Sequence, residues 1–506
     1  MNRALVAFRN VEVQPADQIP VLGMDDFRAI ILDAVKSGAR LAAFYGEPLA
    51  EGAVRLVGVL ADDQAGEWRV LATEPGDGYP ALTPDCPQAG AFEREIAEQW
   101  GVTPQGHPWL KPLRFQRSYR AGHDAWGRTS TTAPVPSVMD FFRVDGPGIH
   151  EVAVGPVHAG IIEPGHFRFQ CHGEQVLHLE ISLGYQHRGI ERALLGGPHP
   201  RTIHHMETLA GDTTIGHALT YCQAVEALAD CHVPPRAQAL RAIALELERL
   251  ANHTGDLGAM AGDVGYLPTA SFCGRLRGDF LNQSALLCGS RFGRGMVRPG
   301  GTAFDVDTAR VEELQQRLAA TFRDVAGAVE LMLEMPSVLA RFENTGLVSL
   351  ALAEELGMVG PAARASGCTR DARRDYPSGA YVQTPMPVAT AETGDVLARA
   401  TVRWEEIQHS VHFIREQLAA LPAGPVRVDC GALAPASRVV SVHEGWRGEI
   451  VHVATTDAHG RFARYKVVDP SFHNWMGLAM ALRGQEISDF PLCNKSFNLS
   501  YCGHDL

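Results

Sequence analysis

Apolar side chains recur at helical spacing in three long stretches of the chain. The stretch 234–260 has prolines in its first turn and then one apolar stripe at i, i+3, i+7 and i+10, formed by Leu240, Ile243, Leu247 and Leu250. Similar patterns cover 307–334 and 403–420. Together these stretches predict long helices that pack as a bundle.

The first 120 residues have a different pattern, typical of a small α/β unit. Helices are predicted over 25–38 and 91–100, and strand-like runs over 42–46 and 54–62. The segment that follows has no helical or strand period and is rich in Ser, Thr, Pro and Gly, which is typical of a linker.

Short strands are predicted on either side of the long helices, in the four runs 149–155, 174–182, 449–454 and 463–468. We therefore predict an α+β fold with a small N-terminal α/β domain over 1–120, a linker over 121–148 and a large helix-rich domain over 149–506.

Composition and charge exclude several classes of protein. The 506 residues contain 45 Lys and Arg against 58 Asp and Glu, which gives a formal net charge of −13. No basic concentration exists to neutralise nucleic-acid phosphates. No run of about 18 apolar residues is present, and the first residues lack the apolar core of a signal peptide. We expect a soluble protein in the cytoplasm.

Common catalytic motifs are missing. The chain has no GxxxxGKS/T loop, no GxGxxG fingerprint, no HExxH and no GxSxG. NADH binding by this chain is therefore not expected. Its ten cysteines include no CxxC pair, and the closest spacing is nine residues. Because thiolate-bound metals are usually held by closely spaced cysteines, we interpret these thiols as small buried apolar groups.

Two motifs carry a family resemblance. GPVHAGIIEPGHFRF (155–169) and GYQHRGIERAL (184–194) resemble the start of the large subunit of group-4 nickel–iron hydrogenases, the hydrogenase-4 and formate hydrogenlyase type. That subunit is homologous to the 49-kDa subunit of respiratory complex I. RFGRGMVRPGG (291–301) and EGWRGEIVHV (444–453) continue the resemblance, and 93–115 resembles the 30-kDa subunit of complex I.

The resemblance implies a fold, partners and a location. The N-terminal domain would be 30-kDa-like, and the large domain would have the fold of the hydrogenase large subunit and the 49-kDa subunit. The partners would be a small subunit that carries a 4Fe–4S cluster, antiporter-like membrane subunits and other subunits of a hydrogenase-4 or complex I-like assembly. The chain would lie peripherally on the cytoplasmic side of the cell membrane.

The sequence departs from the family at the metal site. In active relatives two CxxC pairs hold the nickel, and the matching positions here are Ala210, Thr213, Ser500 and Gly503. Hydroxyl, methyl and hydrogen do not replace thiolate for a soft metal, so we expect no nickel–iron centre and no cofactor bound by this chain. The quinone-binding Tyr and His of the 49-kDa subunit match Gly211 and Pro164.

A set of titratable residues remains near these positions. As a candidate proton or quinone path we single out the cluster His158, Glu163, His166, His187, Arg188, Glu207, Asp212 and His217. The alternative is that these side chains only join strands to helices through hydrogen bonds. For Asp212, which precedes two threonines, the local sequence favours a helix N-cap, with a proton carrier or hard-metal ligand as the alternative.

The sequence leaves three functions open. The first is a large subunit that takes part in electron transfer coupled to ion translocation, with a quinone as the candidate redox partner. The second is a purely structural or coupling subunit. The third is an active hydrogenase with unusual ligands such as Cys171, Cys493 and Cys502, which the missing CxxC pairs disfavour.

Overall fold

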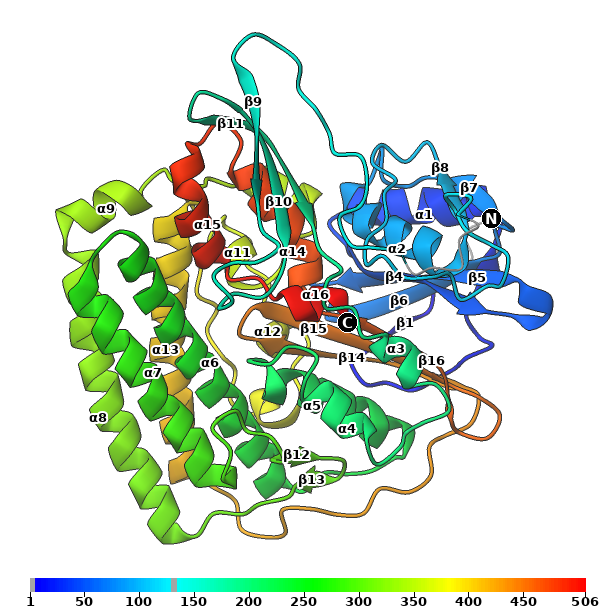
Figure 1. Ribbon diagram of the computed structural model, residues 1–506. Helices are drawn as coiled ribbons and strands as arrows, with labels where there is room; N and C mark the ends of the chain where they lie inside the picture. Colours follow the sequence, from blue (N-terminus) through cyan, green and yellow to red (C-terminus); the bar gives the residue numbers. More distant parts are fainter. Residues whose placement is uncertain (1–4, 129–133) are drawn as a thin grey trace.

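The computed structural model describes residues 5–128 and 134–506 and has a mixed α+β architecture. Figure 1 shows three regions: an N-terminal sheet with its helices, a central sheet, and a bundle of long helices on the far side of the central sheet. The expected α+β class is confirmed at this level. Among the described residues, every helix is too short or too polar to span a membrane.

The N-terminal sheet has the strand order β1–β6–β5–β4, with β3 parallel to β6. Its strands are β1 (Ala7–Phe8), β3 (Val21–Leu22), β4 (Arg40–Pro48), β5 (Val54–Asp62) and β6 (Glu67–Thr73). Helices α1 (Met24–Lys36) and α2 (Gly90–Trp100) pack on it, and β7 (Gly78–Pro80) pairs with β8 (Thr103–Gln105). The helices and strands predicted in this part of the chain are confirmed.

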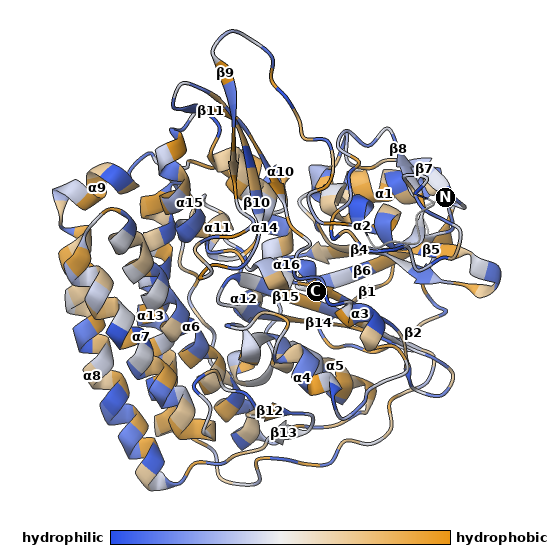
Figure 2. Cartoon of the chain, viewed as in Figure 1, coloured by the Kyte–Doolittle hydropathy of each residue, from blue (hydrophilic) through white to orange (hydrophobic). Residues whose placement is uncertain are grey.

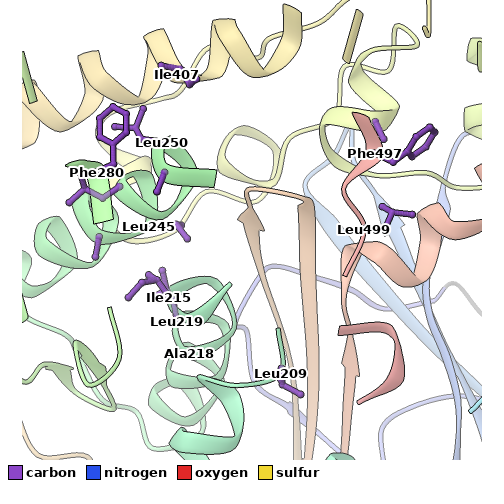
Figure 3. Packing of buried hydrophobic residues seen from close by; sticks show 14 of the residues in the cluster. Leu209, Ile215, Ala218, Leu219, Leu245, Leu250, Phe280, Ile407, Phe497 and Leu499 are labelled. Carbon is purple, nitrogen blue, oxygen red and sulfur yellow. The ribbon is translucent and has the colours of Figure 1, made fainter. Parts of the chain in front are cut away.

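The bundle consists of α6 (Pro235–Asp263), α7 (Leu267–Cys288), α8 (Thr308–Leu333) and α13 (Val396–Ala419). The three predicted long helices are confirmed as α6, α8 and α13. Apolar side chains of α6, α7 and α13 meet in its interior, among them Leu250, Phe280 and Ile407 (Figure 3). Helix α8 mixes polar and apolar residues along its length (Figure 2), as expected for a helix that buries one face.

The central sheet is antiparallel, in the order β16–β15–β14–β2. Its strands are β2 (Gln14–Pro15), β14 (Ser437–Gly445), β15 (Gly448–Thr456) and β16 (Phe462–Val468), so the two late strands predicted here are confirmed. A second antiparallel sheet contains β9 (Ile149–Val154), β10 (His166–His172) and β11 (Gln175–Ser182).

Short elements complete the fold. They are α3 (Ile190–Ala193), α4 (Thr202–Met206), α5 (Thr214–Leu228), the pair β12 (Val297–Arg298) and β13 (Gly301–Thr302), α9 (Pro336–Phe342), α10 (Leu350–Glu355), α11 (Gly360–Arg364), α12 (Ala372–Asp375), α14 (Pro470–Ala481), α15 (Phe490–Phe497) and α16 (Tyr501–Asp505). In the predicted linker, 121–128 and 134–148 contain no helix or strand, and 129–133 lies outside the described residues.

Buried ion pairs join the N-terminal sheet to the central sheet. Arg40 of β4 donates to both oxygens of Glu449, at 2.9 and 2.7 Å. In the same way Arg438 reaches Glu47, at 2.6 and 2.7 Å. Valines of β14 and β15 also share one apolar cluster with the N-terminal sheet. The N-terminal part is therefore packed firmly against the region that carries the candidate site.

A second charged cluster lies between the central sheet and the bundle. Glu406 of α13 accepts hydrogen bonds from Arg249 and Arg364, and it contacts His253 at 2.6 Å. These four side chains are at most 1 % exposed. Because a buried guanidinium needs a carboxylate partner, the cluster fixes how α6, α11 and α13 sit against one another.

Replacing Glu95 with Gln tests the buried ion pairs at the interface. Glu95 is 1 % exposed and contacts Arg114 and Lys466, so Glu95→Gln removes the carboxylate that Arg114 contacts and leaves Lys466 with Glu191 alone. We expect a loss of about 3 kcal/mol in the free energy of unfolding, measured by chemical denaturation. The control Glu74→Gln affects a pair with Arg55 that is 46 % exposed on the Glu74 side, and it should cost less than about 1 kcal/mol. Equal losses in the two variants would contradict this role.

Candidate functional site

An arginine–aspartate ion pair occupies the centre of the candidate site. Arg447 lies in the turn between β14 and β15 and donates to both oxygens of Asp212, at 2.6 and 2.8 Å. The guanidinium carbon lies 3.9 Å from the centre of the Trp446 ring. Burial opposes ionisation of Asp212, but the charge of Arg447 and the hydrogen bonds to the carboxylate together outweigh burial and lower the pKa of that carboxyl. Asp212 is therefore an anion held by two charge-assisted hydrogen bonds.

The start of α5 shows that the predicted N-cap at Asp212 is wrong. Thr213 is the N-cap residue, and its side chain makes no capping hydrogen bond to the helix amides. Instead Glu248, from α6, accepts hydrogen bonds from the amides of Ile215 and Gly216, at 2.7 and 3.2 Å. The Asp212 side chain is thus free to bind Arg447, because the carboxyl group of a residue on another helix satisfies the first amides of α5.

The four positions matched to the lost nickel ligands do not fit a nickel–iron centre. Ala210 supplies only a methyl group, and the Thr213 hydroxyl contacts Arg447 at 3.2 Å. The Ser500 hydroxyl caps α16 by accepting from the Gly503 amide at 2.9 Å. An added Cβ at Gly503 would lie 2.6 Å from the carboxyl carbon of Asp469, so a cysteine side chain has no room there.

Beside Asp469 a buried chain of hydrogen-bonding side chains begins. His217 Nε2 lies 2.9 Å from Asp469 Oδ2, and His217 Nδ1 lies 3.2 Å from His452 Nε2. His452 Nδ1 lies 2.9 Å from the hydroxyl of Tyr465. One consistent set of protons has each group donating toward Asp469, with both imidazoles neutral. Burial lowers the pKa of His452 and raises that of Tyr465.

Three residues of the predicted cluster lie at this site besides Asp212. One is His217, in the chain just described. Another is Glu163, which accepts a hydrogen bond from the Tyr501 amide at 3.2 Å. Burial, followed by the charge of Glu163, raises the pKa of the Cys502 thiol. The third is Arg188, which donates to the carbonyl of Leu209 at 3.0 Å and to that of Cys502 at 3.5 Å.

The remaining members of the cluster have partners elsewhere. His158 and His166 contact backbone carbonyls of their own loop, at Gly165 and Gly155. His187 contacts the carbonyl of Asp505 at 2.7 Å. Glu207 accepts from Arg298 at 2.6 Å and from the amide of Gly295. For these four residues the alternative of plain hydrogen bonding between segments describes the geometry better.

Sequence patterns did not point to the partners of these candidates. Arg447 and His452 lie in the block 444–453 that carries the family resemblance, but no sequence pattern marks them as site residues. The same holds for Asp469, Tyr465 and Glu248. For His452, Tyr465 and Glu248 the available signal is a polar residue in a strand or helix that is otherwise buried, as in the run from Ile450 to Ala454, where His452 is fully buried.

The cysteines invoked for an unusual metal site have separate surroundings. The Cys493 sulfur lies beneath Gly346, and Cys171 is buried in β10. Cys502 lies 3.5 Å from the hydroxyl of Ser500. Within the described part of the chain, no group of three or more His, Cys, Asp or Glu side chains could hold a metal ion.

Comparisons with known proteins give a consistent picture. Residues 263–438 and 427–505 match the family described as "Respiratory-chain NADH dehydrogenase, 49 Kd subunit". Formate hydrogenlyase subunit 5 of Escherichia coli is 30% identical over 84% of this chain and 76% of its own length. The carbon monoxide-induced hydrogenase of Rhodospirillum rubrum is 32% identical over 69% of this chain and 97% of its own length. NADH-quinone oxidoreductase subunit 4 of Thermus thermophilus is 31% identical over 66% of this chain and 89% of its own length.

The protonation of Glu248 gives a testable pH dependence. Burial raises its pKa from 4.5 to about 8, so between these values the folded protein keeps a proton that the unfolded chain has lost. Stability should therefore fall as the pH rises from about 4.5 to 8. Glu248→Gln should remove part of this fall and gain up to a few kcal/mol relative to the parent at pH 8, measured by denaturation at several pH values.

The exposed Glu312 on α8 provides the matched control, since Glu312→Gln removes a carboxyl that is not buried. Its pH dependence should follow that of the parent protein. The interpretation fails if Glu248→Gln and Glu312→Gln change the pH dependence equally.

Proposed function

The chain belongs to the family that unites the 49-kDa subunit of respiratory complex I with the large subunits of group-4 hydrogenases, and we propose that it is a member that works without a nickel–iron centre. In this proposal it is the large subunit of a membrane-bound respiratory complex. Its site transfers protons while electrons pass through partner subunits. The complex couples this electron transfer to ion movement.

The observation that carries the proposal is the ion pair between Asp212 and Arg447. A cationic guanidinium is a poor neighbour for a divalent metal, and here its charge is matched by a carboxylate from the segment where relatives carry nickel ligands. Gly503 supports the same conclusion, since Asp469 fills the space that a side chain at this position would need.

The chain from Asp469 to Tyr465 supports the proposed handling of protons. Its three contacts measure 2.9, 3.2 and 2.9 Å, each short enough for a proton to pass along a hydrogen bond. This series of hydrogen-bonded side chains begins at Asp469, next to Gly503, and leads through the buried interior into the central sheet. A change of charge at the site would alter proton positions along it, which is one way to link redox events to movements of the surrounding subunits.

An apolar loop beside Glu163 suits a docked partner. Val157, Ile161 and Ile162 are 78%, 87% and 47% exposed, and such a cluster of apolar groups is typical of a protein interface. We propose that the small subunit with a 4Fe–4S cluster covers this loop. Antiporter-like subunits would then hold the assembly at the cytoplasmic side of the membrane.

A quinone is the proposed electron acceptor of the complex. Gly211 is exposed, and a Cβ built on it meets no atom within 4 Å, so no side chain blocks the approach of a ligand at this position. The second candidate function is a purely structural subunit. It is favoured by His158 and His166, which contact only backbone carbonyls and a side chain from nearby in the sequence.

Metal analysis of the purified complex tests the central claim. We expect iron, from clusters in partner subunits, without stoichiometric nickel, and no H₂ evolution from reduced methyl viologen, because the four matched positions supply no thiolate. Elemental analysis and gas chromatography on one sample measure both quantities. Stoichiometric nickel together with H₂ turnover would disprove the proposal.

Substitution of His217 tests the proton chain. With reduced methyl viologen as donor and a short-chain quinone as acceptor, we expect the complex to reduce the quinone. His217→Gln should slow quinone reduction at least about tenfold and change the pH profile of the rate, because the substitution interrupts the hydrogen-bonded path between Asp469 and His452. His459→Gln, in an exposed turn, should leave the rate unchanged. An absence of quinone reduction, or equal rates in both variants, would favour the structural alternative.

A further inference from the structure

Two cysteines that are distant in sequence lie in direct contact. The sulfur of Cys430 donates to that of Cys231 at 2.9 Å, and the two residues are separated by 199 positions in the chain. A disulfide bond measures about 2.05 Å, so a small approach of the sulfurs would bring them to bonding distance. The expectation that all the cysteines are buried apolar groups is wrong for this pair, since both are only half-buried.

The backbone on both sides of the pair is held in place. Cys231 follows the end of α5, and its amide donates to the carbonyl of Glu226 at 2.8 Å. In the segment that carries Cys430, the amide of Val428 donates to Gly300 at 3.0 Å, and the amide of Ala434 donates to Leu228 at 2.7 Å. The contact between the sulfurs is therefore fixed by the fold on both sides.

A cavity of about 720 Å³ gives reagents access to one of the sulfurs. Cys231 lines this cavity together with polar side chains that include Gln223, Gln238 and Ser378. The wall combines these polar side chains with apolar ones such as Val11, Val13 and Leu219, and the opening is large enough to admit a small thiol or disulfide. Cys430 is not among the residues that line this cavity.

We propose that Cys231 and Cys430 form a reversible disulfide that is exchanged with low-molecular-weight disulfides. The Cys231 thiolate attacks one sulfur of the small disulfide, which forms a mixed disulfide and releases one small thiolate. Cys430 then loses its proton and attacks the Cys231 sulfur, which closes the protein disulfide and releases the second small thiolate. Two protein thiols are oxidised, one small disulfide is reduced to two thiols, and the protons pass to the leaving thiolates.

The order of attack follows from the surroundings of the two sulfurs. Burial, followed by the hydrogen bond to Cys231, raises the pKa of Cys430 to about 12. Cys430 therefore keeps its proton and donates it to Cys231 in the reduced state. Cys231, which faces the cavity, is the sulfur that reacts first.

The disulfide would link the far ends of the two elements that the central ion pair joins at their near ends. Helix α5 begins just after Asp212 and ends near Cys231, whereas β14 begins soon after Cys430 and ends just before Arg447. Midway, the Ser441 hydroxyl donates to the carbonyl of Thr220 at 2.9 Å. Oxidation would thus staple α5 to β14 at the end opposite the candidate site. This inference does not depend on the proposed function.

Oxidised glutathione on the purified full-length chain provides the test. Peptide mapping without reductant should show Cys231 joined to Cys430 with the loss of two hydrogens, and dithiothreitol should reverse it. Because the bond closes a long loop, the oxidised protein should melt about 5 °C higher than the reduced protein. The shift should vanish in both Cys231→Ser and Cys430→Ser, and should persist in the half-buried control Cys502→Ser.

Three outcomes would overturn the proposal. The first is that both cysteines remain open to alkylation by iodoacetamide after oxidation. The second is that oxidation stops at a glutathione adduct, and the third is that Cys231 pairs with the neighbouring Cys222. If Cys430→Ser folds poorly, Cys430→Ala replaces it in the melting experiment. Peptide mapping of oxidised Cys231→Ser must then show no disulfide at Cys430 if the proposal is correct.

Discussion

The requirement that a buried guanidinium be matched by negative charge organises this protein. Ion pairs form between Arg447 and Asp212, between Arg40 and Glu449, and between Arg364 and Glu406. Each of them joins segments that are distant in the sequence. An unpaired charge in such surroundings costs several kcal/mol, so the sheets and the bundle have little freedom to shift. The candidate site inherits its geometry from this constraint.

The Asp212–Arg447 pair also changes what the site can do chemically. Relatives that bind nickel need soft, anionic thiolates around an open position. Here the same region contains a closed pair of hard, charged groups, one glycine packed against a carboxylate and one serine that caps a helix. The arrangement suits the storage and transfer of protons better than it suits the binding of a metal, and this is why we place proton chemistry at the centre of the proposed function.

Much of the secondary structure could be predicted from local pattern. The stripes that predicted α6, α8 and α13 work because each helix buries apolar residues at the period of its own backbone. Helix α7 gave no such signal, because its glycines and polar residues interrupt the stripe. The candidate residues were partly predictable: Asp212, His217, Glu163 and Arg188 do lie together, whereas His158, His166, His187 and Glu207 bind elsewhere.

The sequence by itself determined the helix and strand periods, the missing CxxC pairs and, through its motifs, the family. It could not show that Asp212 would leave the helix cap to Glu248, that His217 would meet His452, or that Cys231 would contact Cys430. Each of these depends on residues more than thirty positions apart. Only the packing of α5 between α6 and the central sheet brings them together, because local propensity contains no information about which distant group will fill a neighbouring space.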